Sequence, residues 1–260
     1  MTVEIGVQLR PWFVSGMTVE EALEEAASAG YTAVEVGYQF AGPLGLQAMT
    51  ELLEAKSMLL AAFHLGIDWV NVSQNELENV VSAAAELLVG LGGAFLLAST
   101  RPDGLGEPGA LEVAARLGSR LQVAADAATK GGATLCIHNH WWEFERPGVF
   151  EAITGDLPLA IDLAHLWRSG QDVEVRLRSW SGRVRYLHIR DGVAGHWVPV
   201  VGEGVLPLDQ WLRIPGSELQ WGIVELEPDP DGPAISENWE GTWTERATMS
   251  RQYLKAHDLG

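Results

Sequence analysis

The sequence predicts a single (β/α)8 TIM barrel over residues 1–260. Apolar runs of strand length alternate with helical segments eight times, and most of these runs are continuous. Continuous apolar runs are typical of parallel strands covered on both faces, and eight repeats favour a closed barrel over an open sheet. A chain of 260 residues, 47% of them hydrophobic, has the size and the apolar content of one such domain.

Each expected strand is a short apolar run that ends where polar residues begin. In chain order these strands cover residues 3–9, 31–36, 58–63, 94–98, 133–137, 157–161, 184–189 and 219–226. The expected helices between them cover residues 18–29, 44–56, 75–91, 108–130, 148–153, 173–180, 207–212 and 242–257. Thr18 and Glu21 have the spacing of a capping box, and Pro108 suits the first turn of a helix. Glycines stop several of these helices.

Composition excludes several classes of function. Cys136 is the one cysteine, so no intramolecular disulfide forms, and we expect a cytoplasmic protein. A net charge of −18 repels nucleic acid, and no apolar segment reaches the ~20 residues of a membrane span. The N-terminus is typical of a strand and not of a signal peptide. Schiff-base chemistry needs a lysine in the site, whereas Lys56, Lys130 and Lys255 fall on expected helices or their ends.

Residues 136–144, Cys-Ile-His-Asn-His-Trp-Trp-Glu-Phe, place two imidazoles and a carboxylate directly after a buried strand. Residues i and i+2 of a strand point the same way, so His138 and His140 point together, with Glu143 on the loop beyond. An unpaired polar group buried in a protein costs about 1–3 kcal/mol. A strand end that opens onto a metal or catalytic site removes this cost. A satisfied hydrogen-bond cluster is the alternative.

Similar polar residues follow the other expected strands, and reactive side chains of such barrels lie at the carboxyl ends of the strands. Those at or just beyond the strand ends are Glu35, His64, His138, His140, Glu143, Asp162, His165, His188, Arg190, Asp191, Glu225 and Glu227. Five of the seven histidines belong to this set. One such histidine is best explained as structural, but their convergence on one rim predicts a functional site.

Four of these residues have the ligand types of a hard-to-borderline divalent cation: Glu143, Asp162, His188 and Glu225. Carboxylates clustered without a cation repel one another and raise one another's pKa, whereas a dication resolves that repulsion. The competing interpretation is an ion-pair network with Arg146, Arg168 and Arg190.

The motifs together resemble one known family. They are His-Asn-His-x-x-Glu-Phe at 138–144, Gly-Tyr-Thr-Ala-Val-Glu at 30–35, Asp-Leu-Ala-His at 162–165, Leu-His-Ile-Arg-Asp at 187–191 and Val-Gly-Glu-Gly-Val-Leu-Pro at 201–207. In this order and spacing they resemble the sugar phosphate isomerase/epimerase superfamily, the xylose isomerase-like TIM barrels. Arg190 stands where the family usually has lysine. The resemblance extends over nearly the full chain.

The resemblance implies one divalent metal ion, Mn, Co, Mg or Zn, held by Glu143, Asp162, His188 and Glu225. The ligand on the fifth strand stays open, because other branches carry a ligand glutamate at the position of His138. His138 or His140 is then a ligand in place of Glu143 or beside it. On the eighth strand Glu225 is preferred to Glu227, because it lies nearer the strand end.

The remaining site residues are implied to bind substrate: His138, His165, His64, Glu35, Arg190 and Trp142. His165 matches a family histidine that contacts a substrate hydroxyl, while His64 and Glu35 are expected to line the mouth. Tryptophans 141, 142, 167 and 197 lie near the predicted rim, where they either pack on a sugar or against a lid.

Removing a proton from carbon beside a carbonyl gives an enediolate, whose charge a bound metal stabilises. His140 and Glu227 are the acid–base candidates. Isomerisation, epimerisation and dehydration share this step, and the sequence does not choose among them. The acidic loop at 228–232 disfavours phosphate, so we expect a non-phosphorylated sugar, keto-sugar or polyol as substrate.

Two other classes compete with an isomerase, epimerase or dehydratase. An abasic-site endonuclease of the same superfamily needs three metals and a basic face, which the net charge of −18 disfavours. A non-catalytic sugar-binding barrel subunit would keep the cavity without the chemistry. The family resemblance also makes a homo-oligomer a possible assembly.

Overall fold

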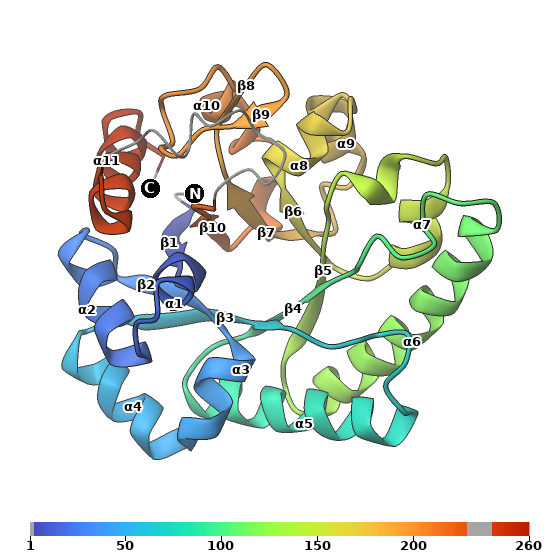
Figure 1. The fold of residues 1–260 in the computed structure, drawn as a ribbon, viewed down its shortest axis with the longest axis horizontal. Coiled ribbons are helices and arrows are strands. Elements are labelled where there is room, and N and C mark those ends of the chain that lie inside the picture. The colour runs from blue at the N-terminus through green and yellow to red at the C-terminus, as the bar shows by residue number, and fades with distance from the viewer. Residues whose placement is uncertain (1–2, 228–240, 260) are drawn as a thin grey trace.

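The computed structural model describes residues 3–227 and 241–259, and its parallel strands close into the predicted barrel (Figure 1). The barrel strands are β1 (Glu4–Gln8), β2 (Ala33–Gly37), β3 (Leu59–Leu65), β4 (Phe95–Ser99), β5 (Thr134–His138), β6 (Leu159–Asp162), β7 (Val184–Ile189) and β10 (Trp221–Val224). Each strand pairs with its neighbours in chain order, and β1 pairs with β10 to close the ring. All eight correspond to predicted strands, and every strand end lies within two residues of its predicted position.

The predicted helices lie outside the strands, where they cover the outer face of the barrel (Figure 1). They are α2 (Val19–Ser28), α4 (Gly45–Ala55), α5 (Gln74–Gly90), α6 (Ala110–Lys130), α7 (Val149–Thr154), α9 (Val173–Ser179), α10 (Leu208–Trp211) and α11 (Trp243–Ala256). The predicted capping box opens α2: the Thr18 hydroxyl accepts from the Glu21 N–H, and the Glu21 carboxylate accepts from the Thr18 N–H. The alternation of strand and helix read from the sequence is therefore confirmed.

Several short elements were not predicted. They are α1 (Arg10–Val14), α3 (Tyr38–Ala41), α8 (Leu163–Arg168), the 3-10 turns η1 (Gly42–Leu44), η2 (Trp142–Phe144) and η3 (Gly216–Glu218), and the hairpin strands β8 (Gly192–Val193) and β9 (His196–Trp197). A segment of two to six residues is too short for a hydrophobic period to emerge. Most of these elements follow the carboxyl end of a barrel strand, so they build the rim of the predicted site.

A dry plug fills the barrel interior below that rim. Its buried members include Ala62, Leu97, Cys136, Tyr186 and Ile223, contributed by five different strands. Burial raises the pKa of the Cys136 thiol, so this cysteine is a packing residue. The polar residues at the strand ends therefore stand on an apolar floor that screens their charges poorly.

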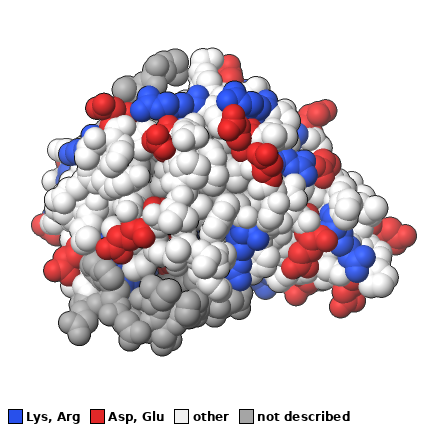
Figure 2. All heavy atoms as spheres, turned by 90° about the horizontal axis from the view of Figure 1, so that it is seen from above, with Lys and Arg blue, Asp and Glu red and all other residues white. Residues whose placement is uncertain are grey.

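Acidic and basic side chains are interspersed on the face shown in Figure 2, where basic residues occur singly or in small groups. Such a face, on a chain with a net charge of −18, lacks the continuous basic surface that favours binding to nucleic acid. Among the described helices, none is both long and apolar enough to cross a membrane. The acidic loop at 228–232 lies outside the described residues.

The contact between α6 and α7 yields a test of the fold. A Cβ on Gly118 would lie 2.4 Å from the carbonyl oxygen of Ala152 and 3.0 Å from that of Ile153. Alanine normally stabilises a helix by about 1 kcal/mol relative to glycine. We predict that Gly118→Ala reverses this sign and lowers the free energy of unfolding by about 1–3 kcal/mol, because α7 must move away.

Urea denaturation of both proteins measures this difference. Gly182→Ala is the matched control, because a Cβ there meets no atom within 4 Å, and its stability should stay within about 0.5 kcal/mol of wild type. Equal stability of Gly118→Ala and Gly182→Ala would contradict the packing of α7 on α6.

Candidate functional site

A cavity of about 390 Å³ opens at the carboxyl ends of the barrel strands. Predicted site residues that line it are His64, His138, His140, Trp142, His165, Arg190, Glu225 and Glu227. They come from β3, β5, the α8 helix after β6, and the segments after β5, β7 and β10. The convergence of five histidines on one end of the barrel is borne out, because His188 lies just below the same cavity, with its ring centroid 4.6 Å from that of His138.

Four buried residues stand close enough to share one metal ion: His138, Asp162, His188 and Glu225. One ligand atom of each lies within 4.8 Å of those of the other three. Their exposed fractions are 2%, 0%, 0% and 5%. Two imidazoles and two carboxylates, each at or just after the end of a different strand, thus meet at one point of the cavity floor.

His188 is held between two carboxylates. Its Nε2 lies 2.7 Å from Oε2 of Glu35, and its Nδ1 lies 2.7 Å from Oε2 of Glu225. Burial disfavours the charged imidazole, but the two carboxylates outweigh burial and raise the pKa of His188 to about 10. In the absence of any other cation, His188 is therefore an imidazolium at neutral pH.

Glu35 lies at the bottom of the site, not at the mouth where the sequence analysis placed it. It is fully buried and does not line the cavity. Its Oε2 accepts from the Tyr186 hydroxyl at 2.7 Å, and its Oε1 accepts from Gln8 at 2.8 Å. Burial opposes its negative charge, but the neighbouring His188 and His64 outweigh burial and lower the pKa of Glu35. The side chain of Glu35 points from β2 into the barrel, where it meets Tyr186 and His188 of β7.

Arg190 neutralises the carboxylates on the other side of His188. Its Nε lies 2.8 Å from Oδ2 of Asp162, and its Nη2 lies 2.6 Å from Oε1 of Glu225 and 3.5 Å from Oε2 of Glu227. Arg190 and His188 together outweigh burial and hold the pKa of Glu225 well below its usual range. Part of the ion-pair network that competed with the metal interpretation is therefore present.

The other two arginines of that alternative lie elsewhere. Arg146 is exposed, and its Nε donates to the Gly106 carbonyl at 2.8 Å. Arg168 stacks over the Trp141 ring at 4.0 Å. Only Arg190 of the three lies against the four-residue group, so the arginines supply one buried positive charge to two buried carboxylates.

Asn139, between the two histidines of the motif, was not predicted to act. Its Oδ1 accepts from the Asp162 N–H at 2.9 Å, and its Nδ2 donates to the Asp162 carbonyl at 3.3 Å. These bonds join the ends of β5 and β6. Asp162 in turn caps α8, because its Oδ1 accepts from the His165 N–H at 2.8 Å. Asn139 and this cap fix the position of the Asp162 carboxylate.

Glu143, predicted as a metal ligand, lies outside the group of four, where His138 takes the place on β5. The Oε1 of Glu143 accepts from the Thr100 hydroxyl, and its Oε2 accepts from the His140 N–H at 2.7 Å. The Nδ1 of the His140 ring lies 3.6 Å from Oε1. Glu143 is thus buried behind His140, where it holds the backbone of that residue and places a negative charge beside its ring.

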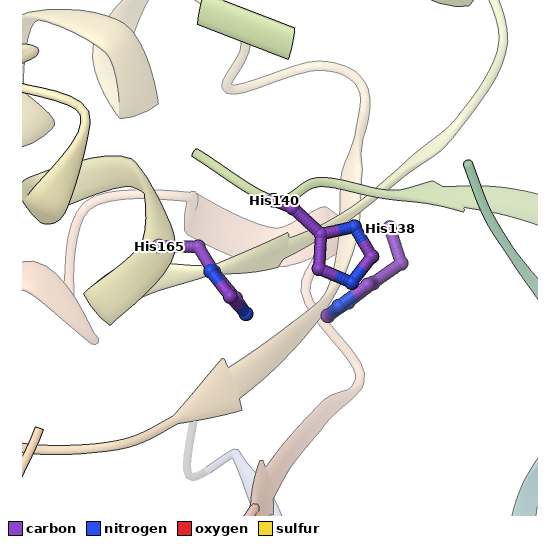
Figure 3. A group of neighbouring side chains, drawn as sticks. All are labelled: His138, His140 and His165. Atoms are coloured by element: carbon purple, nitrogen blue, oxygen red, sulfur yellow. The ribbon is translucent and has the colours of Figure 1, made fainter. Parts of the chain in front are cut away.

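A second group of three possible metal ligands overlaps the first. His138, His140 and His165 each place one ring nitrogen within 4.8 Å of the other two, and their rings face a common space (Figure 3). Burial, with the charges of nearby groups, lowers the pKa of His138 and His165 well below the usual value. These two imidazoles are therefore neutral at pH 7, with a lone pair on one nitrogen.

The rim of the cavity is aromatic. Trp141, Trp142 and Trp197 line it as predicted, and Phe13 and Phe40 form a stacked pair with ring centroids 4.2 Å apart. Trp167 does not line the cavity. Its indole fills the space beside Gly192, where a Cβ would lie 2.8 Å from the ring.

His64 and Glu227 lie at opposite depths of the cavity wall. Nδ1 of His64 lies 3.2 Å from Oε1 of Glu35, and its Nε2 contacts the Ser99 hydroxyl. Glu227 is nearer the solvent, with 24% of its side chain exposed, and it pairs with Arg10. The sequence pattern gave no signal for Arg10, because it follows a strand end that carries no other polar group with a predicted role.

Asp191 holds the segment that carries Trp197 to the rim. Its two oxygens accept from the N–H groups of Gly192, Gly202, Gly204 and Leu206 at 2.8–3.1 Å. A Cβ on Gly204 would lie 2.1 Å from the Asp191 carboxylate, so the backbone there must be glycine. This explains physically why aspartate follows His188 by three residues and why the Gly-x-Gly turn occurs.

Known proteins match this fold and chain length. The family model described as xylose isomerase-like TIM barrel matches residues 23–253. An inosose dehydratase from Lacticaseibacillus casei is 22% identical, with 88% of this chain and 91% of that protein covered. A sugar phosphate isomerase/epimerase structure from Parabacteroides distasonis superposes with a TM-score of 0.77 at 18% identity, covering 98% and 94% of the chains. The structure of D-allulose 3-epimerase from Methylomonas sp. in complex with D-allulose superposes with a TM-score of 0.70 at 17% identity. The alignment covers 98% of this chain and 97% of that one.

The charge pair of His188 and Glu35 gives a pH-dependent prediction. A raised pKa means that protonated His188 stabilises the fold fully below its unfolded pKa, and that this stability is lost as pH rises through about 10. We predict that Glu35→Gln destabilises the metal-free protein by about 1–3 kcal/mol at pH 7, because the buried imidazolium loses one anion. The difference from wild type should shrink as pH approaches 10.

Urea denaturation in a chelator at pH 7, 8.5 and 10 measures this difference. Glu86→Gln, on the exposed face of α5, is the control, and its difference from wild type should stay flat and near zero. A Glu35→Gln difference that does not depend on pH would show that His188 is neutral in the folded protein.

Proposed function

Because the chain belongs to the xylose isomerase-like TIM barrel family, we propose that it is a divalent-metal-dependent isomerase or epimerase of a non-phosphorylated sugar, keto-sugar or polyol. The observation that carries this proposal is the buried group of His138, Asp162, His188 and Glu225 on the cavity floor. The fold by itself hosts many reactions, so the argument rests on these side chains.

The donor atoms of this group fit a metal ion. Nδ1 of His188 and Oε2 of Glu225 are buried and close together, yet neither forms a hydrogen bond of acceptable geometry. Nδ1 of His138 is also buried without a partner. Such atoms are costly in a dry interior, and coordination satisfies them. Carboxylate and imidazole ligands together suit Mn²⁺, Co²⁺ or Zn²⁺ better than Mg²⁺, which prefers oxygen.

The residues around the group support this assignment. A metal-binding histidine usually donates its other N–H to a carboxylate, and Glu35 stands on Nε2 of His188 in that way. Arg190 holds one oxygen of Asp162 and one of Glu225. We propose His138 as the ligand from β5, because both oxygens of Glu143 already accept hydrogen bonds.

The bound metal supplies Lewis-acid stabilisation of the negative charge that forms when a proton leaves carbon beside a carbonyl. His140 and Glu227 are the proposed acid–base groups, because both line the cavity, are partly exposed and lie outside the group of four. The Glu143 carboxylate lies 3.6 Å from Nδ1 of His140, where its negative charge would stabilise the imidazolium that forms when His140 takes up a proton. We propose that His165 contacts a substrate hydroxyl and that Trp142 packs on the sugar, because both line the cavity.

The charges of the cavity favour an uncharged substrate. Among the described residues, three arginines line the cavity: Arg190 contacts two buried carboxylates, Arg10 pairs with Glu227, and Arg101 is exposed. A phosphate close to the four-residue group would have to displace Glu227 from Arg10 or compete with the carboxylates for Arg190. The D-allulose bound to one structural neighbour is a free sugar.

Dehydration is the second candidate reaction. The relative from Lacticaseibacillus casei is named an inosose dehydratase, and it aligns over most of both chains. Loss of a hydroxyl β to the carbonyl begins with the same proton removal, so the same residues serve it. Dehydration also needs an acid that protonates the leaving hydroxyl, whereas epimerisation does not. Glu227 and His140, which line the cavity, are the candidates for this acid.

Incorporation of solvent deuterium into the substrate tests both reactions at once. In D₂O, we expect the Mn²⁺-loaded protein to replace the hydrogen on the carbon next to the carbonyl of a ketohexose or an inosose with deuterium. NMR of the sugar measures the rate. Asp162→Asn and Glu225→Gln should lower the exchange rate by about 10³-fold or more, because the charge of the anion is no longer stabilised. The phosphorylated forms of the same sugars should exchange far more slowly.

Arg178→Gln, on the exposed face of α9, is the control, and it should exchange at the wild-type rate. Tight sugar binding without exchange would favour the non-catalytic sugar-binding subunit. Exchange with sugar phosphates alone would contradict the proposed substrate class.

A further inference from the structure

We propose that His138, His140 and His165 form a second metal site, one that takes a Zn²⁺-type ion on three imidazoles. The three ring nitrogens lie within 4.8 Å of one another and their rings face a common space (Figure 3). Three imidazoles are an established protein ligand set for zinc, with the fourth position open. The inference goes beyond the proposed function, which needs only one metal; an ion on the three imidazoles would engage His140 and leave Glu227 as the acid–base group.

Buried atoms without partners point to a ligand. Nδ1 of His138, of His140 and of His165 is each buried and forms no hydrogen bond. His138 and His165 are themselves nearly inaccessible, with exposed fractions of 2% and 3%. A neutral imidazole normally hydrogen-bonds through both nitrogens when buried. Each of the three imidazoles therefore keeps a buried nitrogen that a ligand would satisfy, although Nδ1 of His140 also lies 3.6 Å from Oε1 of Glu143.

The rings are held in place by stacking and not by hydrogen bonds. The His140 ring stacks on Trp142 with centroids 3.9 Å apart, and the His165 ring stacks on Trp141 at 5.1 Å. Stacking leaves both ring nitrogens available while it limits the rotation of the ring. Zinc–nitrogen bonds of 2.0–2.1 Å bring the ligand nitrogens to about 3.4 Å apart, so small side-chain rotations close the site.

The two metal groups have different chemistry. Asp162, His188 and Glu225 give a mixed set with two carboxylates, whereas the histidine group contains no carboxylate. His138 belongs to both groups, but each keeps enough ligands: three remain for the first ion when His138 turns to the second. Softer, nitrogen-preferring ions such as Zn²⁺ favour the histidine group, and Mn²⁺ favours the carboxylate group.

The second ion would face the cavity. His138, His140 and His165 all line it, so the open coordination position points to where a substrate enters. A neutral oxygen, such as a hydroxyl of a sugar or polyol, is the kind of ligand that such a position binds.

Metal stoichiometry tests the proposal. Untagged protein is stripped with a chelator, loaded with Zn²⁺, freed of excess metal and measured by mass spectrometry. We expect two equivalents for wild type, one for the His140→Gln, His165→Gln double variant and one for the Asp162→Asn, Glu225→Gln double variant. Chelator competition should show that zinc affinity at the histidine site falls by about 100-fold or more in the first variant.

Cobalt gives an independent reading. Four-coordinate Co²⁺ on three imidazoles absorbs visible light strongly, and this band should disappear in the His140→Gln, His165→Gln variant and persist in Asp162→Asn, Glu225→Gln. His257→Gln, at the end of α11 and far from the cavity, is the control and should bind metal as wild type does. Circular dichroism establishes that each variant is folded, and single His140→Gln serves if the double variant is not.

The outcomes separate the two proposals. Wild-type stoichiometry and affinity in the His140→Gln, His165→Gln variant overturn the histidine site and leave the proposed function intact. One wild-type equivalent, lost only with Asp162 and Glu225, also overturns the histidine site. One equivalent lost only with His140 and His165 supports the histidine site and contradicts the carboxylate site on which the proposed function rests.

Discussion

The structure depends on how buried negative charge is balanced at one end of the barrel. Glu35, Asp162 and Glu225 are all at most 5% exposed, and the plug below them is apolar. Carboxylates in such a place are stable only if cations or several donors surround them. The protein supplies Arg190 and a protonated His188, which sit between these carboxylates. Two positive charges against three negative ones leave a deficit that a divalent cation corrects once His188 gives up its proton.

The barrel makes this arrangement possible because it closes. Glu35 on β2 and His188 on β7 lie on strands that are not neighbours in the sheet, yet their side chains meet across the interior. Short elements then complete the site above the strands: α8 presents His165, η2 carries Glu143 behind His140, and the Asp191 hydrogen bonds fix the loop with Trp197. The closed barrel thus fixes the strand ends, and the short elements that follow them build the polar rim of the site.

Most of the residues that line the site were predictable from the sequence, because reactive side chains of such barrels lie at the carboxyl ends of the strands. Asp162, His188 and Glu225 directly follow or end apolar runs, and parallel strands bring their ends together, so local pattern was enough to group them. The depth of Glu35 was not predictable, because it depends on β2 facing β7 across the closed barrel. The place of Glu143 was also missed, since a 3-10 turn of three residues moves it away from His138. Asn139 gave no signal, because its bonds to Asp162 join residues 23 positions apart.

The central claim is that the group of His138, Asp162, His188 and Glu225 holds a metal ion. Crystals grown with Mn²⁺ and measured for anomalous scattering near the manganese edge test it most directly. We predict a strong peak bonded to His138, to Nδ1 of His188 and to the carboxylates of Asp162 and Glu225, with Glu35 still on Nε2 of His188. A map without a peak there, in which Arg190 and protonated His188 alone hold these carboxylates, would contradict the claim.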